Sequence, residues 1–229
     1  MSLPSPLAEL ESQLRTLSHS EEAVQKVRDF AKTLGKTAKR QATFAPEGAL
    51  VRRPITYQDA LETEKITPEE DRFSFLQGDI VRTDAAYFMG EQVRGHPTFV
   101  ILNSTCDLVE ERRTYAALLR VKPLLETDPR WKEKLGQLLK FESTREMYLP
   151  PLPGDVDNTV ANIVDFDGIA QIQLADLKLA IRVASLSLVG WRVYGTMVRN
   201  VMVRAGKSEV ALRMAFEGAR PVIHSHPNP

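Results

Sequence analysis

The sequence predicts an α+β fold, most simply a small curled antiparallel barrel with flanking helices and an N-terminal helical arm. Apolar residues recur at helical spacing in the first third of the chain, and short β-rich runs bounded by turn formers follow Phe73. A chain of 229 residues also suffices for one sizeable core with an added lobe. We therefore expect a helical arm and linker over residues 1–72. A barrel-like core with an inserted helix and a C-terminal helix is expected over residues 73–229.

The arm begins with a predicted helical hairpin. Its shorter helix covers about residues 7–17, and Ser18 followed by Glu21 predicts a capping box at the start of the second helix. An apolar stripe then continues at helical spacing until Gly35 supplies a stop. Residues 36–56 contain prolines and a glycine without sustained periodicity, which predicts a linker or an extended arm.

The core is predicted as a meander of strands interrupted by one helix. That helix starts at Asp128 and Pro129 and carries Trp131 on its apolar side. A final helix over residues 188–204 has an apolar stripe along one face. The expected strands cover residues 78–83, 98–102, 115–121, 147–149, 162–166, 169–174 and 181–186.

Composition argues against several classes of protein. The longest uncharged apolar runs fall short of the roughly 20 residues that a spanning helix needs, so no membrane span is predicted. The N-terminal residues do not look like a secretory signal, and a single cysteine is typical of a reducing compartment. We therefore expect a cytoplasmic protein. No group of acids and histidines has metal-ligand spacing and no Gly-rich phosphate loop occurs, so neither a metal nor a cofactor is predicted.

The charged residues are segregated along a chain whose net charge is zero. Eight basic residues oppose two acids over residues 24–53, whereas seven acids oppose two basic residues over residues 57–80. Charge runs usually form solvated surface, and adjacent blocks of opposite sign also pair with each other. Separate acidic and basic partners are the alternative.

Three pieces of sequence resemble a known family. They are Gly-Asp-Ile-Val at residues 78–81, the loop Gly-Glu-Gln-Val-Arg-Gly-His-Pro at residues 90–97, and the apolar strand that follows that loop. Together they resemble the opening of the MazF/PemK family of toxin endoribonucleases. A strand over residues 182–187 followed by a helix is similar to the later part of those chains. The resemblance implies an SH3-like barrel, a toxin–antitoxin role, a homodimer and loops that bind single-stranded RNA.

The resemblance also implies which residues would cleave RNA without a metal ion. The family places an Arg immediately before the loop Pro, where this chain has His96, while Arg94 lies two residues earlier. Cleavage needs a base for the 2′-hydroxyl proton and a cation for the developing negative charge. His96 is the candidate base, and Arg94 or Arg182 the candidate cation. The family's hydroxyl after a later strand has no counterpart after Tyr115 in the stretch that ends at Pro123.

A polar cluster follows the second predicted strand of the core. Asn103, Ser104, Thr105 and Asp107 are candidate substrate-binding residues, and Cys106 is a candidate reactive thiol. In one interpretation Cys106 is a nucleophile, with His96 as its base and Asp107 as the group that orients the base. In the other, the polar side chains make turn hydrogen bonds to the backbone while Cys106 packs as a small apolar group.

Two functions from different classes stay open at this point. The first is a nucleic-acid-interacting barrel that binds or cleaves single-stranded RNA. The second is a non-catalytic protein–protein interaction or scaffold module that contacts a protein partner through the N-terminal arm and the charge blocks. A basic groove formed by Arg94, His96 and Arg182 would favour the first function. Acids in that groove, or burial of the polar cluster, would favour the second.

Overall fold

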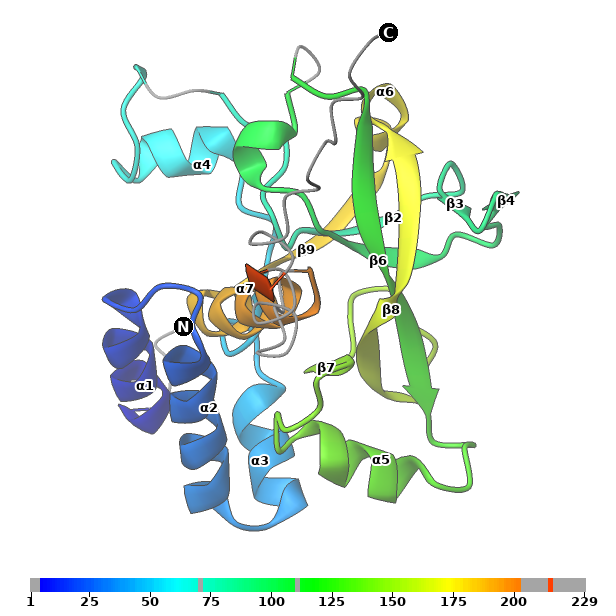
Figure 1. Ribbon diagram of the computed structural model, residues 1–229. Coiled ribbons are helices and arrows are strands. Elements are labelled where there is room, and N and C mark those ends of the chain that lie inside the picture. The colour runs from blue at the N-terminus through cyan, green and yellow to red at the C-terminus, as the bar shows by residue number, and fades with distance from the viewer. Residues whose placement is uncertain (1–4, 70–71, 110–111, 203–213, 216–229) are drawn as a thin grey trace, which may run out of the picture.

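A computed structural model describes residues 5–69, 72–109, 112–202 and 214–215, and it confirms the α+β class. Seven helices and nine strands are formed by these residues, and Figure 1 shows α7 between the sheet and the N-terminal helices. The helices are α1 (Ser5–Arg15), α2 (Glu21–Leu34), α3 (Thr37–Phe44), α4 (Tyr57–Glu62), α5 (Trp131–Leu138), α6 (Leu174–Leu177) and α7 (Leu188–Met202), with a 3-10 turn η1 (Thr105–Asp107). The strands are β1 (Val51–Arg52), β2 (Ile80–Arg82), β3 (Tyr87–Phe88), β4 (Glu91–Gln92), β5 (Thr98–Ile101), β6 (Tyr115–Leu125), β7 (Glu146–Leu149), β8 (Thr159–Gln173) and β9 (Ile181–Leu186).

All nine strands belong to one antiparallel sheet that is not closed. Its order is β1-β9-β2-β5-β6-β8-β3-β4, with β7 paired to β8. Strands β2, β5, β6 and β8 form a meander, and β9 returns to pair with β2, the first strand of that meander. The predicted closed SH3-like barrel is therefore not confirmed, although the mixed antiparallel architecture is.

The sheet has an apolar cluster on each of its faces. Successive side chains of a strand point to opposite faces, so neighbours such as Ile80 and Val81, or Phe99 and Val100, enter different clusters. One cluster is shared with α1, α2 and α7, and the other with α6. Long strands β6 and β8 support both clusters, and their register shifts between Leu119 and Arg120. The two predicted strands over residues 162–174 are in fact one continuous strand, β8.

The N-terminal helices pack onto the rest of the protein. Leu7 and Leu14 of α1 and Val27 of α2 are fully buried in the same cluster as the residues of the sheet and α7. The helical hairpin is thus confirmed, and α2 ends at Gly35 (φ 72°) as predicted. The capping box is wrong, because α2 begins at Glu21 after Ser20 and the Glu21 carboxylate pairs with Arg28 instead. The boundary predicted at residue 72 stays a prediction.

The linker predicted over residues 36–56 contains helix α3. Phe44 is the buried residue of this helix, and its ring lies 5.9 Å from that of Phe30 and 5.0 Å from that of Phe141. A helix held by one aromatic side chain leaves no apolar periodicity in the sequence, which explains the wrong prediction. Among the described residues, no helix has the length and apolar character needed to cross a membrane.

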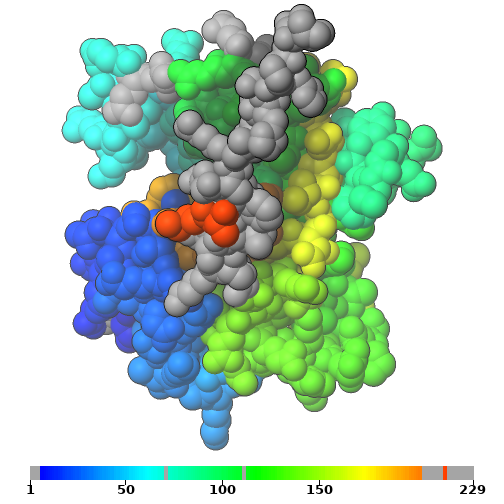
Figure 2. All heavy atoms as spheres, viewed as in Figure 1, coloured from blue at the N-terminus to red at the C-terminus, as the bar shows by residue number. Residues whose placement is uncertain are grey.

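The β3–β4 hairpin and the helical side lie far apart. Figure 2 shows the hairpin as a lobe that projects from the sheet side, away from α1 and α2. The hairpin belongs to the connection between β2 and β5, so that connection extends away from the main body. The opposite end of the β2–β5 pair faces α7, since Tyr194 of that helix donates a hydrogen bond to the Ile101 carbonyl.

Candidate functional site

The predicted site residues separate into two groups at the two ends of the β2–β5 pair. Arg94 and His96 lie in the connection that precedes β5, and both are exposed. His96 Nδ1 lies 2.9 Å from Asp84 Oδ2, and the His96 backbone N–H donates to Asp84 Oδ1 at 2.6 Å. The backbone of His96 has a positive φ of 51°. Its partner is therefore an acid of the same loop.

Arg182 lies at the other end, inside a buried polar network. Its guanidinium is 2.8 Å from the carboxylate of Asp79, and it donates to the backbone carbonyls of Ser74 at 3.0 Å and Ile55 at 2.7 Å. The hydroxyl of Ser185 donates to the second oxygen of Asp79. Arg182 thus holds together the loop before β2, the segment after β1 and strand β9.

Burial decides the electrostatics of this network. The Asp79 side chain is fully buried, and burial raises the pKa of its carboxyl above 3.8, while Arg182, Ser185 and the Leu76 backbone N–H act in the opposite direction. A buried carboxylate that lost its cation would be left without compensation for its lost hydration. The network therefore fixes the geometry of this end of the sheet.

The polar side chains after β5 hydrogen-bond to the backbone of other segments, and not within their own turn as one interpretation predicts. Asn103 Oδ1 accepts from the Ala117 backbone N–H at 2.6 Å, and Thr105 Oγ1 accepts from the Gln77 backbone N–H at 3.0 Å. Asp107 lies 3.7 Å from Arg113 in an ion pair. These contacts join the end of β5 to β6 and to the start of β2.

Cys106 differs from both interpretations. It is exposed, so it does not pack as a small apolar group, and its Sγ atom lies 3.2 Å from the Ser104 hydroxyl. The proposed base, His96, pairs with Asp84 at the opposite end of β5, and Asp107 pairs with Arg113. The structure does not bring a Cys–His–Asp arrangement together.

A pocket of about 290 Å³ lies beside the buried network. The start of β2, the turn η1, the end of β9 and the start of α7 form its walls. Thr105 is the one residue of the predicted polar cluster that reaches it. The lining residues are Ile55, Leu76, Gln77, Asp79, Thr105, Ser185, Leu186, Ser187, Leu188 and Trp191.

Gln77 and Trp191 fix each other at the wall of this pocket. The Gln77 side chain donates to the Leu102 carbonyl at 3.0 Å and accepts from Trp191 Nε1 at 3.3 Å. The Trp191 ring also packs edge-on against the His19 ring, with 4.2 Å between centroids, and Arg192 lies over it at 4.9 Å. Trp191 is thus held in one orientation by groups on three sides.

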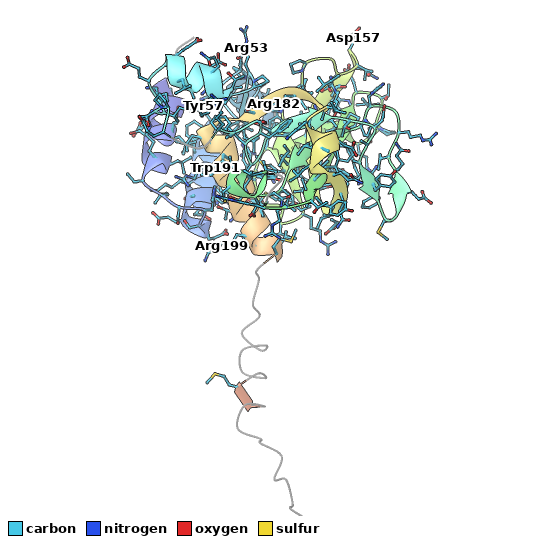
Figure 3. All side chains as sticks on the ribbon, turned by 90° about the horizontal axis from the view of Figure 1, so that it is seen from above. Arg53, Tyr57, Asp157, Arg182, Trp191 and Arg199 are labelled. Atoms are coloured by element: carbon cyan, nitrogen blue, oxygen red, sulfur yellow. The ribbon has the colours of Figure 1, made fainter. Side chains whose placement is uncertain are left out.

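Two further hollows share lining residues with the pocket. One, of about 720 Å³, shares Ser187 and Leu188 and contains Arg52 and Arg53 together with Glu11 and Glu47. The other, of about 220 Å³, shares Thr105 and contains Arg72, Phe73 and Lys178. We call the pocket and the two hollows together the groove. Figure 3 shows Arg53, Tyr57, Arg182 and Trp191 on the half of the molecule that carries α7, with Asp157 on the other half.

The groove has cationic side chains toward both ends and an aromatic ring in its middle. Arg52 is exposed, and the Arg53 side chain is 89% exposed while its guanidinium lies 3.6 Å from Glu47. Phe73 stacks edge-on against Tyr57, with 5.6 Å between centroids. Glu11 and Glu47 balance the charges of Arg52 and Arg53 at one end, so the end that contains Arg72 is better suited to an anionic ligand. The groove contains no assembled acid–base pair, since His96 lies outside it and the Arg182 guanidinium pairs with Asp79.

Sequence reasoning missed Asp79, Gln77 and Trp191 as site residues. Asp79 was treated only as the acid of the Gly-Asp-Ile-Val piece. Its position directly before an apolar strand was the signal that could have identified it as a site residue. Trp191 gave no signal, because an aromatic residue on an amphipathic helix is usually core. Among the described residues, no group of three His, Cys, Asp or Glu side chains has an arrangement that could hold a metal ion.

No family model, no curated protein and no solved structure matches this chain. The chemistry of the groove is therefore inferred from its own residues.

Proposed function

We propose that this protein binds single-stranded RNA along the groove, and that its sheet is a divergent SH3-like barrel of the MazF/PemK kind. The observation that carries the binding proposal is the groove itself, where Arg52 and Arg53 lie beside Glu11 and Glu47 toward one end and Arg72 lies toward the other. Between the two ends lie the pocket of about 290 Å³ and the ring of Trp191. Basic grooves with aromatic side chains bind single strands because phosphates need cations and exposed bases need flat apolar surfaces.

The strand order supports the fold proposal. In an SH3-like barrel a late strand pairs with the first strand of the meander, and β9 pairs with β2 in this way, although its other neighbour is β1 and the sheet stays open. Helix α7 follows β9, as a helix follows the late strand in the resemblance. The toxin role, the homodimer and the cytoplasmic location stay predictions.

Binding without cleavage is the version of the proposal that the geometry supports best. Cleavage requires a base and a cation within hydrogen-bond reach of one phosphodiester. His96 pairs with Asp84, whereas Arg182 pairs with buried Asp79 at the other end of the strands. The alternative is a non-catalytic interaction or scaffold module that contacts a protein partner through the N-terminal arm and the charge blocks. It is less favoured because the apolar face of α1 is already buried against the core.

A charge-matched pair of variants tests the proposal. In the first variant, Arg52→Gln and Arg53→Gln remove two cations from the groove, and in the control, Arg130→Gln and Arg145→Gln remove two exposed cations elsewhere. Fluorescence anisotropy with a labelled mixed-sequence RNA single strand measures the affinity over a range of salt concentrations. We expect the groove variant alone to bind more weakly, with a slope of log affinity against log salt reduced by about 1.4, since each neutralised phosphate contributes about 0.7.

Two outcomes would overturn the proposal. The first is that the wild-type protein gives no anisotropy change at low salt. The second is an equal loss of affinity in both variants, which would mean that the contacts are spread over the surface. Gel analysis of the same RNA after incubation checks that it stays intact.

A further inference from the structure

One face of strands β3, β8 and β6 carries uncharged side chains that the rest of the protein leaves largely uncovered. Residues opposite each other in an antiparallel pair lie on the same face, and Tyr87, Gln171 and Ala117 follow one another across the three strands in this way. Tyr115 is 56% exposed, Tyr87 51% and Ile169 39%. We call this surface the sheet patch, and its residues are Tyr87, Tyr115, Ala117, Ile169, Gln171 and Gln173.

The composition of the sheet patch indicates a contact surface. Charged residues make up 26% of the chain, whereas none of the six residues of the patch is charged. Large side chains with apolar bodies gain free energy when they are covered, and tyrosine is enriched where proteins contact each other. None of the six lines the groove, so the patch is separate from the surface to which RNA binding is assigned.

The chain leaves helix α7 beside the sheet patch. Val201, in the last turn of that helix, lines the same hollow as Asp167 of β8. Exposed and buried residues alternate along the end of β8, so Asp167 lies on the same face as Ile169 and Gln171. The residues that follow Met202 therefore start at the margin of the patch.

The sequence after α7 contains the pattern of a short amphipathic helix. Ser208 is a favoured cap residue and Gly218 a favoured stop, which predicts a helix over residues 209–217. The charged residues of this stretch recur at every fourth position and so share one side of a helix. They are Glu209, Arg213 and Glu217, and the other six are Val210, Ala211, Leu212, Met214, Ala215 and Phe216. Apolar side chains thus occupy the rest of the predicted helix.

A helix of this length needs a surface against which to pack. Isolated helices shorter than about 12–15 residues are marginal in water, and most of their stability in proteins comes from packing of the apolar face. Met214 and Ala215 are helical and exposed, with Met214 67% exposed, and Figure 3 shows their turn away from the main body. The segment and the sheet patch are therefore two largely exposed apolar surfaces of one chain.

The two surfaces match in size and lie within reach of each other. A helix over residues 209–217 is about 14 Å long, and the patch extends over about 13 Å along β8 from Ile169 to Gln173. Residues 203–208 connect Met202 to the segment and span up to about 20 Å when extended. Since Asp167 precedes the patch by only two residues, this connection is long enough.

We propose that residues 209–217 are a strap that closes over the sheet patch, with Leu212 and Phe216 against its two tyrosines. The structure shows the open arrangement. Closure covers the apolar side chains of both surfaces and leaves the charged side of the strap in water, whereas the open strap presents the patch to a protein partner. The strap thus controls access to a contact surface, which goes beyond RNA binding and does not depend on it.

Disulfide formation within one molecule tests the proposal. In a Cys106→Ser protein, Gln171→Cys places a thiol on the patch and Ala215→Cys places one on the apolar side of the strap, and both positions are exposed. Under a mild oxidant we expect a disulfide within the monomer, detected by non-reducing gel and peptide mass analysis. Arg130→Cys in place of Gln171→Cys is the control, because this exposed residue precedes α5 and lies outside the patch. We expect the control disulfide to form at least about tenfold more slowly, since closure raises the effective concentration of the strap thiol at the patch.

A matched pair of strap variants tests which side of the segment makes the contact. Leu212→Gln with Phe216→Gln removes two large apolar side chains, and Arg213→Gln with Glu217→Gln removes two charges from the opposite side. The first variant is expected to lower the rate of disulfide formation at Gln171→Cys to that of the control position, because the burial that favours closure is lost. The second is expected to keep the rate of the unaltered strap.

Three outcomes would overturn the proposal. Equal rates at Gln171→Cys and Arg130→Cys would show that the strap has no preference for the patch, and equal rates in the two strap variants would show that its apolar side makes no contact. A disulfide between two molecules, with a yield that rises with protein concentration, would assign the patch to a second copy of the chain. Failure of RNA binding would leave the proposal standing, since the patch and the groove share no residue.

Discussion

A carboxylate–guanidinium pair and a carboxylate–imidazole contact lie at opposite ends of strands β2 and β5, and the first of them is buried. Asp79 and Arg182 approach to 2.8 Å with side chains that are 0% and 16% exposed. Asp84 and His96 approach to 2.9 Å with side chains that are 38% and 79% exposed. The two distances are nearly equal, so the surroundings of each pair decide how much it contributes to the stability of the folded protein.

The difference between the two ends bears on stability and on function. An exposed pair is screened by water and salt and typically contributes about 0–1 kcal/mol. A buried pair has lost its hydration, so removal of one partner leaves an uncompensated charge in the interior. The buried end supports the walls of the groove and holds Arg182, whereas the exposed end carries Arg94 and His96, the other two residues predicted for catalysis. Variants at each end can test this contrast.

The largest expected effect is that of Arg182→Leu. This variant leaves the carboxylate of Asp79 buried without its cation and removes the donor to the Ile55 carbonyl. We expect the free energy of unfolding to fall by about 3–5 kcal/mol, as measured by urea denaturation at neutral pH. Arg94→Leu removes an exposed cation at the other end and is the control, with an expected change within about 0.5 kcal/mol. Equal effects of the two variants would contradict the contrast between the ends.

A smaller effect is expected from His19, which lies beside the groove. Its ring packs against Trp191 and burial lowers its pKa below 6.5; the charge of Arg192 acts in the same direction, and a hydrogen bond to the Arg192 backbone opposes both. The folded protein therefore binds fewer protons at this site than the unfolded chain does. Its contribution to stability is present above pH 6.5 and is lost as the pH falls from 6.5 through the lowered pKa.

Replacement of His19 tests this assignment. His19→Phe keeps a ring against Trp191 but cannot take up a proton, so we expect its urea midpoint to fall less between pH 7 and pH 5 than that of the wild type. An equal fall in the variant and the wild type would show that the acid sensitivity comes from another group.

The fold was largely predictable because its strongest signals are local. Strand alternation over residues 98–102 and 181–186 follows from side chains that point to opposite faces of a sheet, and each residue carries that information itself. Helix α3 was not predictable, since Phe44 packs against Phe30 of the preceding helix and against Phe141 from a distant part of the chain. Closure of the sheet depends on similar long-range pairing, so its absence among the described strands could not be derived either.

The candidate site was less predictable because it depends on register. Arg182 belongs to a strand about a hundred residues after β2, and the pairing of Val81 with Arg182 decides which end of β2 this side chain reaches. The sequence offered no way to choose, so Arg182 was grouped with His96. Gln77 lies just before β2 and Thr105 just after β5, so pairing of these two strands brings the two residues to the same end of the sheet. Their hydrogen bond was not predicted.

The smallest expected effect is that of His96→Gly. The backbone of His96 has a φ of 51°, a conformation that glycine adopts without strain, and this gain opposes the loss of the exposed ion pair with Asp84. The free energy of unfolding should therefore change by less than about 1 kcal/mol. RNA affinity should equal that of the wild type, since His96 lies outside the groove. A clear loss of affinity with unchanged stability would move the RNA-binding surface to the β3–β4 end of the sheet and would restore His96 as a functional residue.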